Sequence, residues 1–426
     1  MDNKNVFVAI ALSMAVLLFW GAFFETPRQV KENQTLGNTQ TNQNNVQSDI
    51  TPNINQEKIV KKISRKDALT EVDRIIIENT KVKGSISLKG AIFDDLSFKN
   101  YKKDLKSEES VVLLNPKGIE DGYYIESGWA SVGNEVEVPG VDSLWQVKGN
   151  RVLNEKSDVV LEWNNGKGLT FKKTIKLDDK YLFKIKQEVK NNTSSKINLY
   201  PYSQITRNKK PDDVMGFYIL HEGFIGVFDG ELKEDDYDDI KDKKIVRNSD
   251  NGWLGITDKY WVTAIVPPKD KNFKSTFLYK DNYRANYILN SPVTINPKST
   301  SSNEFKLFVA AKEVETVDGY AESENIEKFD LTIDWGWFYF FTKPLFFVID
   351  YLFKFSGNFG IAIVLITLAI RIIFFPLANY SFRSMAKMKA VQPEMTRLKE
   401  LHKEDKVKLQ QEMMALYRKE KINPAS

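Results

Sequence analysis

The chain of 426 residues lacks cysteine altogether and has only two histidines, His221 and His402. Without thiols it can form no disulfide, no thiolate metal site and no cysteine nucleophile. An exported domain of this chain must therefore depend on its hydrophobic core alone for stability. The scarcity of histidine also leaves few candidates for the imidazole chemistry that most zinc sites and hydrolytic triads require.

Motifs that bind ions or phosphates are incomplete. The acidic run KEDDYDDIKDKK (residues 233–244) lacks the glycine at position six and the glutamate at position twelve of a calcium loop, so we interpret it as a solvated turn. The segment NNGKG around Lys167 lacks the earlier glycine of a phosphate-binding loop. Trp129, Trp145 and Trp163 could stack on a sugar, although tryptophans in a large sandwich more often belong to the core. The sequence predicts no cofactor, no metal and no enzymatic activity.

A broad basic surface is also missing. The formal net charge is only +4, and residues 383–426 contain eleven Lys/Arg against six Asp/Glu, which leaves −1 for the rest of the chain. Nucleic-acid-binding proteins have a basic patch over one whole face, so we expect no specific nucleic-acid sequence as a partner. The positive charge is concentrated at the C-terminal end.

Apolar residues are plentiful at the two ends of the chain. Residues 6–24 (VFVAIALSMAVLLFWGAFF) contain no charge and are long enough to cross the ~30 Å hydrocarbon core. The alternative is a cleaved signal peptide, but its apolar region would be shorter, and GAFFETP offers no small-x-small cleavage site. We expect an N-terminal anchor that stays on the protein. Half of residues 33–56 are Asn or Gln, so residues 25–56 are predicted to form a flexible polar linker.

Residues 57–333 have the pattern of β-strands. Val82, Gly84, Ile86 and Leu88 alternate with polar residues in KVKGSISLKG. LTFKKTIKLDDKYLFKIKQEV is typical of a hairpin. The residues predicted on one of its faces are Leu169, Phe171, Ile175 and Leu177 and, after the turn, Tyr181, Phe183, Ile185 and Val189. Strands at this spacing predict one large antiparallel β-sandwich outside the membrane.

Residues 335–357 contain eleven aromatics but are interrupted by Lys343, Asp350 and Lys354. At 100° per residue these three charges fall on one narrow face of a helix, and Pro344 suits a first turn. A broad aromatic face opposite a narrow charged one predicts an amphipathic helix lying in the membrane interface. The alternative is a core helix of the sandwich.

A second membrane-spanning helix is predicted at residues 358–378, followed by a helical hairpin at 382–421. Apolar residues in both arms of the hairpin recur at helical spacing. They are Met385, Met388, Val391, Met395, Leu398 and His402 in the first arm, and Val407, Met413, Met414 and Leu416 in the second. Because Lys and Arg cluster after the second span, we place the hairpin and the N-terminus in the cytoplasm and the β domain outside. That topology separates His221 from His402, so no shared histidine site is expected.

Three long segments carry a resemblance to a known family. IVLITLAIRIIFFPL, SMAKMKAVQPEM and QEMMALYRKEKINP, in this order, closely resemble the YidC/Oxa/Alb family of membrane-protein insertases. The anchor, linker, large β domain and aromatic helix agree with its Gram-negative form, whose periplasmic domain resembles the galactose-mutarotase supersandwich. The mutarotase chemistry is not implied, since that site needs more than the one histidine of this domain.

The resemblance assigns a role to Arg371, which interrupts an apolar run from Phe359 to Phe375. Members of the family place a positive residue in a hydrophilic groove of five helices, open to cytoplasm and lipid. Arg371 is implied to be that residue and Thr367 its neighbour, and their i, i+4 spacing alone puts both on one helical face. The alternative is snorkelling, because Asn379 lies about 12 Å further along the helix and the side chain could reach the interface.

The resemblance also implies a localisation and partners. It implies a multi-pass protein of the bacterial inner membrane that inserts and helps fold membrane proteins, alone or with the Sec translocon. Its partners would be nascent membrane proteins, ribosome–nascent chain complexes and membrane lipids, and the Met-rich hairpin would be functional. Family members continue beyond KINPAS with four more spanning helices, so we expect these remaining core helices to be absent from this sequence. The rival hypothesis is a bitopic envelope protein whose periplasmic β domain binds a glycan or a partner.

Overall fold

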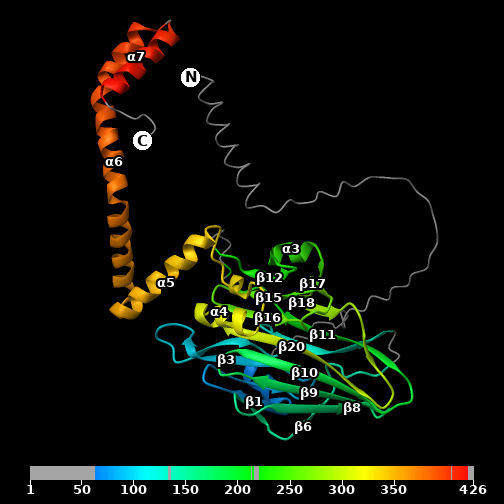
Figure 1. Cartoon of the computed structure of the whole chain (residues 1–426). Helices are drawn as coiled ribbons and strands as arrows, with labels where there is room; N and C mark the ends of the chain where they lie inside the picture. The colour runs from blue at the N-terminus through cyan, green and yellow to red at the C-terminus, as the bar shows by residue number, and fades with distance from the viewer. Residues whose placement is uncertain (1–62, 133–135, 213, 215–219, 404, 421–426) are drawn as a thin grey trace, which may run out of the picture. The chain divides into compact units, whose positions relative to one another are not determined.

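The computed structural model describes residues 63–132, 136–212, 214, 220–403 and 405–420. The chain divides into two compact units, Met1–Asp49 and Ile50–Ser426, and all described residues belong to the second. The predicted anchor at residues 6–24 and the linker at residues 25–56 lie outside the described residues. Figure 1 shows a β-sheet region followed by helices at the C-terminal end of the chain.

The β domain consists of two large sheets. In the larger sheet the spatial order is β14 (Ile245–Ser249), β17 (Phe273–Lys280), β18 (Asn282–Leu289), β11 (Ile197–Arg207), β5 (Tyr123–Ser131), β3 (Ile92–Lys102), β2 (Val82–Ser87), β1 (Arg74–Glu78) and β7 (Val152–Leu153), with β19 (Val293–Ile295) on β11 and β4 (Ser110–Leu114) on β3. The smaller sheet has the order β13 (Glu231–Asp236), β12 (Gly223–Phe228), β15 (Gly252–Thr257), β16 (Trp261–Val266), β20 (Thr300–Ala311), β10 (Leu182–Asn191), β9 (Leu169–Leu177), β8 (Val159–Asn164) and β6 (Gln146–Lys148). The predicted β-rich domain is confirmed, and between described strands only β1 and β7 run parallel.

The predicted hairpin is β9 and β10. Ile175 pairs with Ile185, and Phe171 pairs with Val189. All eight apolar residues expected on one face are at most 4% exposed, because period-two alternation directs them into the space between the sheets. Lys173 lies on the same inward face and is 1% exposed.

The acidic run at residues 233–244 is not the solvated turn that we expected from its composition. Its first half completes strand β13, and its second half forms helix α3 (Tyr237–Asp242), which starts with a capping box between Asp236 and Asp239. Tyr237 and Ile240, three residues apart, share the inward face of α3 and are buried. Burial of these two side chains outweighs the tendency of the surrounding carboxylates to stay in water.

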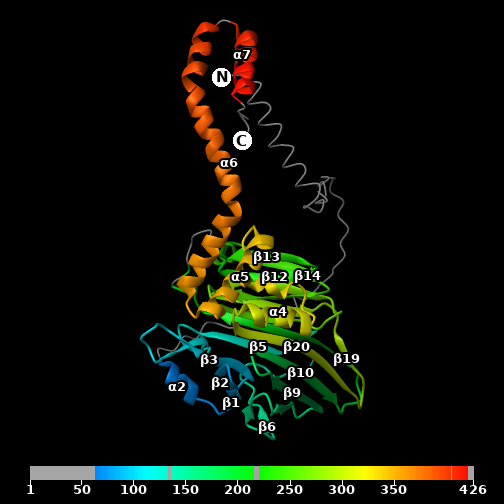
Figure 2. The same cartoon turned by 60° about the vertical axis from the view of Figure 1, so that its left-hand side comes forward.

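Two helical segments close the β domain, and three longer helices follow them (Figures 1 and 2). The chain order is α2 (Arg65–Thr70) before the sheets, then α4 (Val314–Ser323), the 3-10 helix η2 (Phe329–Thr332), α5 (Tyr339–Ser356), α6 (Phe359–Leu401) and α7 (Lys406–Lys419). The predicted second span and the first arm of the predicted hairpin are one helix of 43 residues, α6. Pro376 and Pro393 lie inside it without ending it.

Candidate functional site

The region around Arg371 lies in the first half of α6. The helix begins after Asn358, whose side chain accepts a hydrogen bond from the backbone N–H of Ile361 at 3.2 Å. A helix satisfies its backbone polar groups internally, so it is the form in which an apolar run can cross a bilayer. Within the described part of the chain, α6 is the one helix that is long and apolar enough to do so, and its apolar stretch is almost entirely exposed.

Thr367 and Arg371 lie one turn apart on α6, as their spacing predicts, and both residues are exposed. The hydroxyl of Thr367 donates a hydrogen bond to the carbonyl oxygen of Ile363 at 2.7 Å. Among the described residues, no side chain forms an ion pair with Arg371. The guanidinium therefore presents a positive charge and five N–H donors to whatever surrounds this face of the helix.

The surface around Arg371 is otherwise apolar. Its exposed apolar neighbours on α6 are Val364, Leu368, Ile370, Ile372, Ile373, Phe374 and Phe375. A cation among such side chains costs at least ~2.5–3.5 kcal/mol at the centre of a bilayer. This free-energy cost falls if water or a polar partner reaches the guanidinium. Arg371 is therefore more stable in a hydrated or protein-lined environment than in lipid.

Pro376, five residues after Arg371, adds a second polar feature to this stretch of α6. Proline has no backbone N–H, so the carbonyl oxygen of Ile372, four residues earlier, has no partner within the helix. Inside a membrane such a carbonyl has to be satisfied by water or by a neighbouring helix. This stretch of α6 thus holds a cation and, on a different side of the helix, a carbonyl without its usual helical partner, both within an apolar run.

The helix α5 has no buried residue, which argues against the alternative of a core helix. Its aromatic side chains are largely exposed, as in Phe341 (67%) and Phe355 (80%). The charged face, however, is engaged rather than open. Lys343 Nζ lies 2.9 Å from a carboxylate oxygen of Asp318 in α4 and 2.9 Å from one of Asp330 in η2.

The electrostatics of this cluster follow from those contacts. Burial would lower the pKa of Lys343, but its hydrogen bonds to Asp318 and Asp330 outweigh burial and raise that pKa. Burial would raise the pKa of Asp330, but hydrogen bonds from Lys343 and the hydroxyl of Tyr339 keep it below its ordinary value. Lys343 and Asp330 are therefore both charged across the neutral pH range. Asp318 and Asp330 did not emerge from the sequence analysis, although the acidic residues of α4 and of the segment between α4 and α5 were the visible signal.

The hairpin is formed by the end of α6 and by α7, which folds back on it (Figure 2). The hydroxyl of Tyr417 lies 3.7 Å from the sulfur of Met395 across the two arms. Met395, Met388 and Met413 are half-buried. Met385 and Met414 are 53% and 45% exposed, so the methionines are divided between the contact of the two arms and the solvent.

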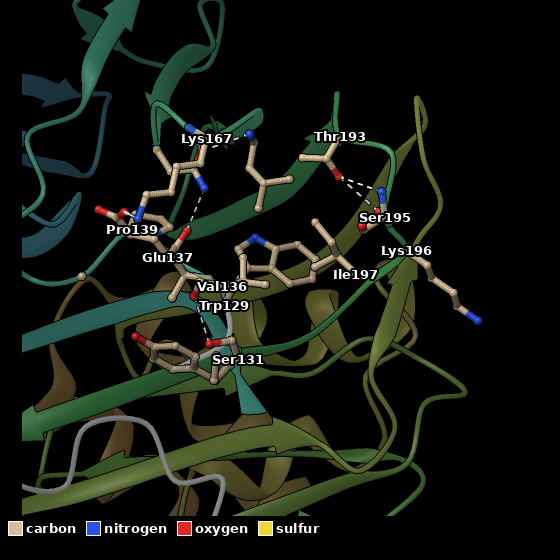
Figure 3. Close-up of a pocket in the computed structure, with 16 residues that line it drawn as sticks. Trp129, Ser131, Val136, Glu137, Pro139, Lys167, Thr193, Ser195, Lys196 and Ile197 are labelled. Carbon is tan, nitrogen blue, oxygen red and sulfur yellow. Dashed lines mark hydrogen bonds and ion pairs between the residues drawn. The ribbon is translucent and has the colours of Figure 1, made fainter. Parts of the chain in front are cut away.

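A cleft of about 840 Å³ opens in the β domain between the ends of β5, β9 and β11. Figure 3 shows the indole of Trp129 at its floor, with the ion pair of Lys167 and Glu137 at one rim and the turn of Thr193 and Ser195 at another. Trp129 is only 3% exposed, so its ring is covered by neighbours and offers no open stacking face.

The other two tryptophans considered for sugar binding are also packed. Trp145 is 6% exposed, and Trp163 packs against the core beside Phe171. Residues 63–420, apart from the short undescribed segments, contain no cluster of three His, Asp or Glu residues that could hold a metal ion. The β domain thus offers no direct support for glycan binding.

Comparisons with known proteins agree with the layout of the chain. The family described as "YidC periplasmic domain" matches residues 74–348, and the family described as "60Kd inner membrane protein" matches residues 351–426. A solved structure of a galactose mutarotase related enzyme from Lactobacillus acidophilus is 12% identical and covers 56% of this chain and 97% of its own, with a TM-score of 0.39. At that TM-score the likeness supports no conclusion about activity.

Curated relatives match the whole chain. The protein named "Membrane protein insertase YidC" from Pelagibacter ubique (strain HTCC1062) is 51% identical over 427 residues, which span 100% of this chain and 75% of the relative. The protein of the same name from Methylorubrum extorquens (strain PA1) is 41% identical, with 100% and 74% covered. Because the identity extends over the β domain and the C-terminal helices alike, the chain belongs to the family of the membrane protein insertase YidC.

Proposed function

We propose that this chain is a membrane protein insertase that works through a hydrophilic groove in the inner membrane, with Arg371 and Thr367 on one wall of it. The single observation that carries this proposal is Arg371, an exposed cation without an ion-pair partner among the described residues, in an apolar helix that could span the membrane. A helix that served only as an anchor would gain nothing from this charge and would bear its cost.

The proposed mechanism needs neither a nucleotide nor a covalent step, so the protein would not act as an enzyme. In a partly hydrated groove of low dielectric constant, Arg371 attracts acidic segments of an incoming chain more strongly than it would in bulk water. The hydroxyl oxygen of Thr367, on the same face of α6, helps to keep this face hydrated. The apolar segments of the substrate then move into lipid, driven by the removal of apolar area from water.

The proposal includes a topology. Residues 6–24 and 358–378 would cross the inner membrane, the β domain would face the periplasm, and the end of α6 with α7 would lie in the cytoplasm. The excess of Lys and Arg beyond residue 383 supports this orientation, because positively charged segments are retained on the cytoplasmic side. The aromatic face of α5 would lie in the membrane–water interface on the periplasmic side of the inner membrane.

The partners follow from the same proposal. Nascent membrane proteins are the substrates, and the Sec translocon and ribosome–nascent chain complexes are the assemblies that would deliver them. The hairpin, with its basic surface and its partly exposed methionines, would contact either the delivered chain or the lipid headgroups. Flexible methionine side chains suit apolar segments of varied shape.

The test uses substitutions at Arg371, introduced in the gene that encodes this chain and expressed in cells depleted of their own insertase. Two substrates are compared that differ only in their translocated tail, which is acidic in one and neutralised in the other. Lysine retains the charge but not the planar fork, so Arg371→Lys should keep most insertion of both substrates. Arg371→Ala should fail mainly on the acidic tail, and Arg371→Glu should fail more severely.

Snorkelling makes the opposite prediction for alanine, because removing the charge makes the helix easier to bury. Equal insertion of both substrates by Arg371→Ala, at matched expression, would therefore remove Arg371 from the mechanism. The control is Arg383, which lies about three turns further along α6 and is also exposed. Arg383→Ala removes the same charge outside the apolar run and should not discriminate between the two tails.

A further inference from the structure

The contacts between α5 and the end of the β domain carry an inference beyond the groove. A helix that simply floats in the membrane interface would direct its charged face toward water and headgroups. In this structure Lys343 instead lies between two carboxylates from separate elements, Asp318 of α4 and Asp330 of η2. The side chains of Lys343, Asp318 and Asp330 are 17%, 27% and 17% exposed, so the triad is largely shielded from solvent.

Further contacts surround this triad. The hydroxyl of Tyr339 donates a hydrogen bond to Asp330 at 2.8 Å, and the indole N–H of Trp335 donates to the backbone carbonyl of Asp330 at 3.3 Å. The ammonium of Lys343 lies 5.7 Å and 5.6 Å from the ring centres of Trp335 and Tyr339. The lysine is therefore held by two anions and two aromatic faces, and each component restricts the same side chain.

The second lysine of the charged face is bound differently. Lys354 Nζ lies 2.7 Å from Glu315 of α4 and 2.8 Å from Asp350 of its own helix. The side chains of Lys354 and Glu315 are 59% and 73% exposed, and ion pairs in such solvated positions contribute little because water and salt screen them. Of the two contacts to α4, only the one made by Lys343 is expected to fix the position of α5.

The opposite end of α5 is joined rigidly to α6. Only Gly357 and Asn358 separate the two helices. Gly357 adopts a left-handed conformation with φ 67° and donates its N–H to the carbonyl of Phe353 at 2.8 Å, which closes α5. The rings of Phe353 and Phe359 are 6.0 Å apart across the corner. A short connection that is hydrogen-bonded and packed in this way transmits a change in the direction of α5 to the first turns of α6.

We propose that Lys343 is a positioning residue that fastens α5 to α4 and η2, and that it thereby sets the orientation of the corner from which the Arg371 helix starts. The functional part of this inference rests on the proposed function, whereas the fastening itself does not. The β domain then contributes to insertion through its C-terminal elements α4 and η2, by holding α5 in one orientation. The sandwich provides the rigid base for these two elements, since Val317 and Phe329 are anchored in its core.

The fastening is tested by measuring a distance, in the chain reconstituted in lipid nanodiscs. The 426 residues contain no cysteine, so Ser323→Cys of α4 and Tyr351→Cys of α5 are the only two labelling sites in this chain. Both positions are exposed. With Lys343 in place we expect one narrow distance distribution, and with Lys343→Ala a clearly broader one. Lys354→Ala is the matched control and should leave the distribution narrow.

A charge exchange separates positioning from general damage. In the triple variant Lys343→Glu with Asp318→Lys and Asp330→Lys, all three charges are reversed and one carboxylate lies between two lysines. This exchange should restore the narrow distribution, whereas Lys343→Glu alone should not. An unchanged distribution in Lys343→Ala would overturn the fastening, and so would failure of the charge exchange to restore it.

The functional part is measured with the same variants in cells depleted of their own insertase. Insertion should fall several-fold in Lys343→Ala, recover in the charge-exchanged triple variant and stay unchanged in Lys354→Ala. Full insertion by Lys343→Ala alongside a broadened distance would overturn the link between the fastening and α6. If the protein expressed from the whole gene, with Lys343 in place, showed a narrow distance but no insertion activity, this would instead refute the proposed function and leave the fastening intact.

Discussion

Lys173 offers a quantitative test of the β domain. Its side chain points between the two sheets and is 1% exposed, its ammonium donates a hydrogen bond to the carbonyl of Ser127 at 3.0 Å, and it lies 5.2 Å from the ring centre of Trp145. Burial lowers the pKa of Lys173 from 10.5 to about 7, against the opposing charge of Glu126. One hydrogen bond and one aromatic face do not replace the hydration of a full positive charge.

The sign of the pH dependence follows from the lowered pKa. Between about pH 7 and pH 10.5 the unfolded chain binds a proton at Lys173 and the folded chain does not. The free energy of unfolding therefore rises with pH in that window and is independent of this group below it. Between pH 7 and pH 9 the rise amounts to about 2 kcal/mol for a group with these two pKa values.

The experiment compares the wild-type chain with Lys173→Met, which keeps the length of the side chain and removes the titrating group. Urea unfolding in detergent, followed by tryptophan fluorescence, reports on the β domain. The substitution should stabilise the domain at pH 7, because a well-packed apolar side chain replaces a buried charge. The advantage of the variant should shrink by about 2 kcal/mol at pH 9. Lys172→Met, on the exposed side of the same strand, is the control. Its difference in unfolding free energy from wild type should be the same at pH 7 and pH 9.

An equal stability difference between wild type and Lys173→Met at pH 7 and pH 9 would refute the reasoning. It would mean that the folded and unfolded chains bind the proton of Lys173 with similar affinity, and that water reaches the ammonium in the folded state. A constant difference would then measure packing alone.

Two further predictions concern topology. A reporter enzyme that is active only after export, fused near Asn251 of the β domain, should be active, and activity of a cytoplasm-specific reporter at the same place would contradict the proposed orientation. Spin labels at Phe341→Cys and Tyr351→Cys, which lie about 15 Å apart along α5 and are 67% and 70% exposed, should report similar shallow depths in the bilayer. Depths that differ by most of this distance would show that α5 crosses the membrane.

The fold of the β domain could be predicted because its signal is local. Period-two alternation in β9 and β10 specifies which residues face inward, and the turn at Asp178 specifies the pairing. The same alternation places Lys173 on the inward face between Phe171 and Ile175, although a lysine is rarely expected in a core. The interpretation of the acidic run as a turn was wrong because composition does not reveal the helical spacing of Tyr237 and Ile240.

The candidate site could be predicted only where it depends on one helix. The spacing of Thr367 and Arg371 gives their common face directly, whereas the partners of Lys343 come from two other elements that periodicity does not relate to α5. The apolar pattern also did not predict that the second span and the first arm of the hairpin form one continuous helix, α6. Pro376 costs one backbone hydrogen bond, but no helix-breaking residue occurs between it and Pro393, and the helix therefore continues.

The length of α6 determines which charged partners the basic hairpin can attract. A helix of 43 residues is about 64 Å long, roughly twice the ~30 Å of the hydrocarbon core that the proposed span would occupy. About half of α6 extends beyond the hydrocarbon core on the cytoplasmic side, and its first few ångströms lie in the headgroup layer. If the helix is perpendicular to the membrane, the connection between α6 and α7 lies about 25–30 Å from the membrane surface. The Debye length at physiological ionic strength is about 8 Å. The lysines near that connection, such as Lys399, Lys403 and Lys406, are then too far from anionic lipids to be attracted by them and act on what approaches from the cytosol. Only the part of the hairpin nearest the membrane can contact lipid headgroups.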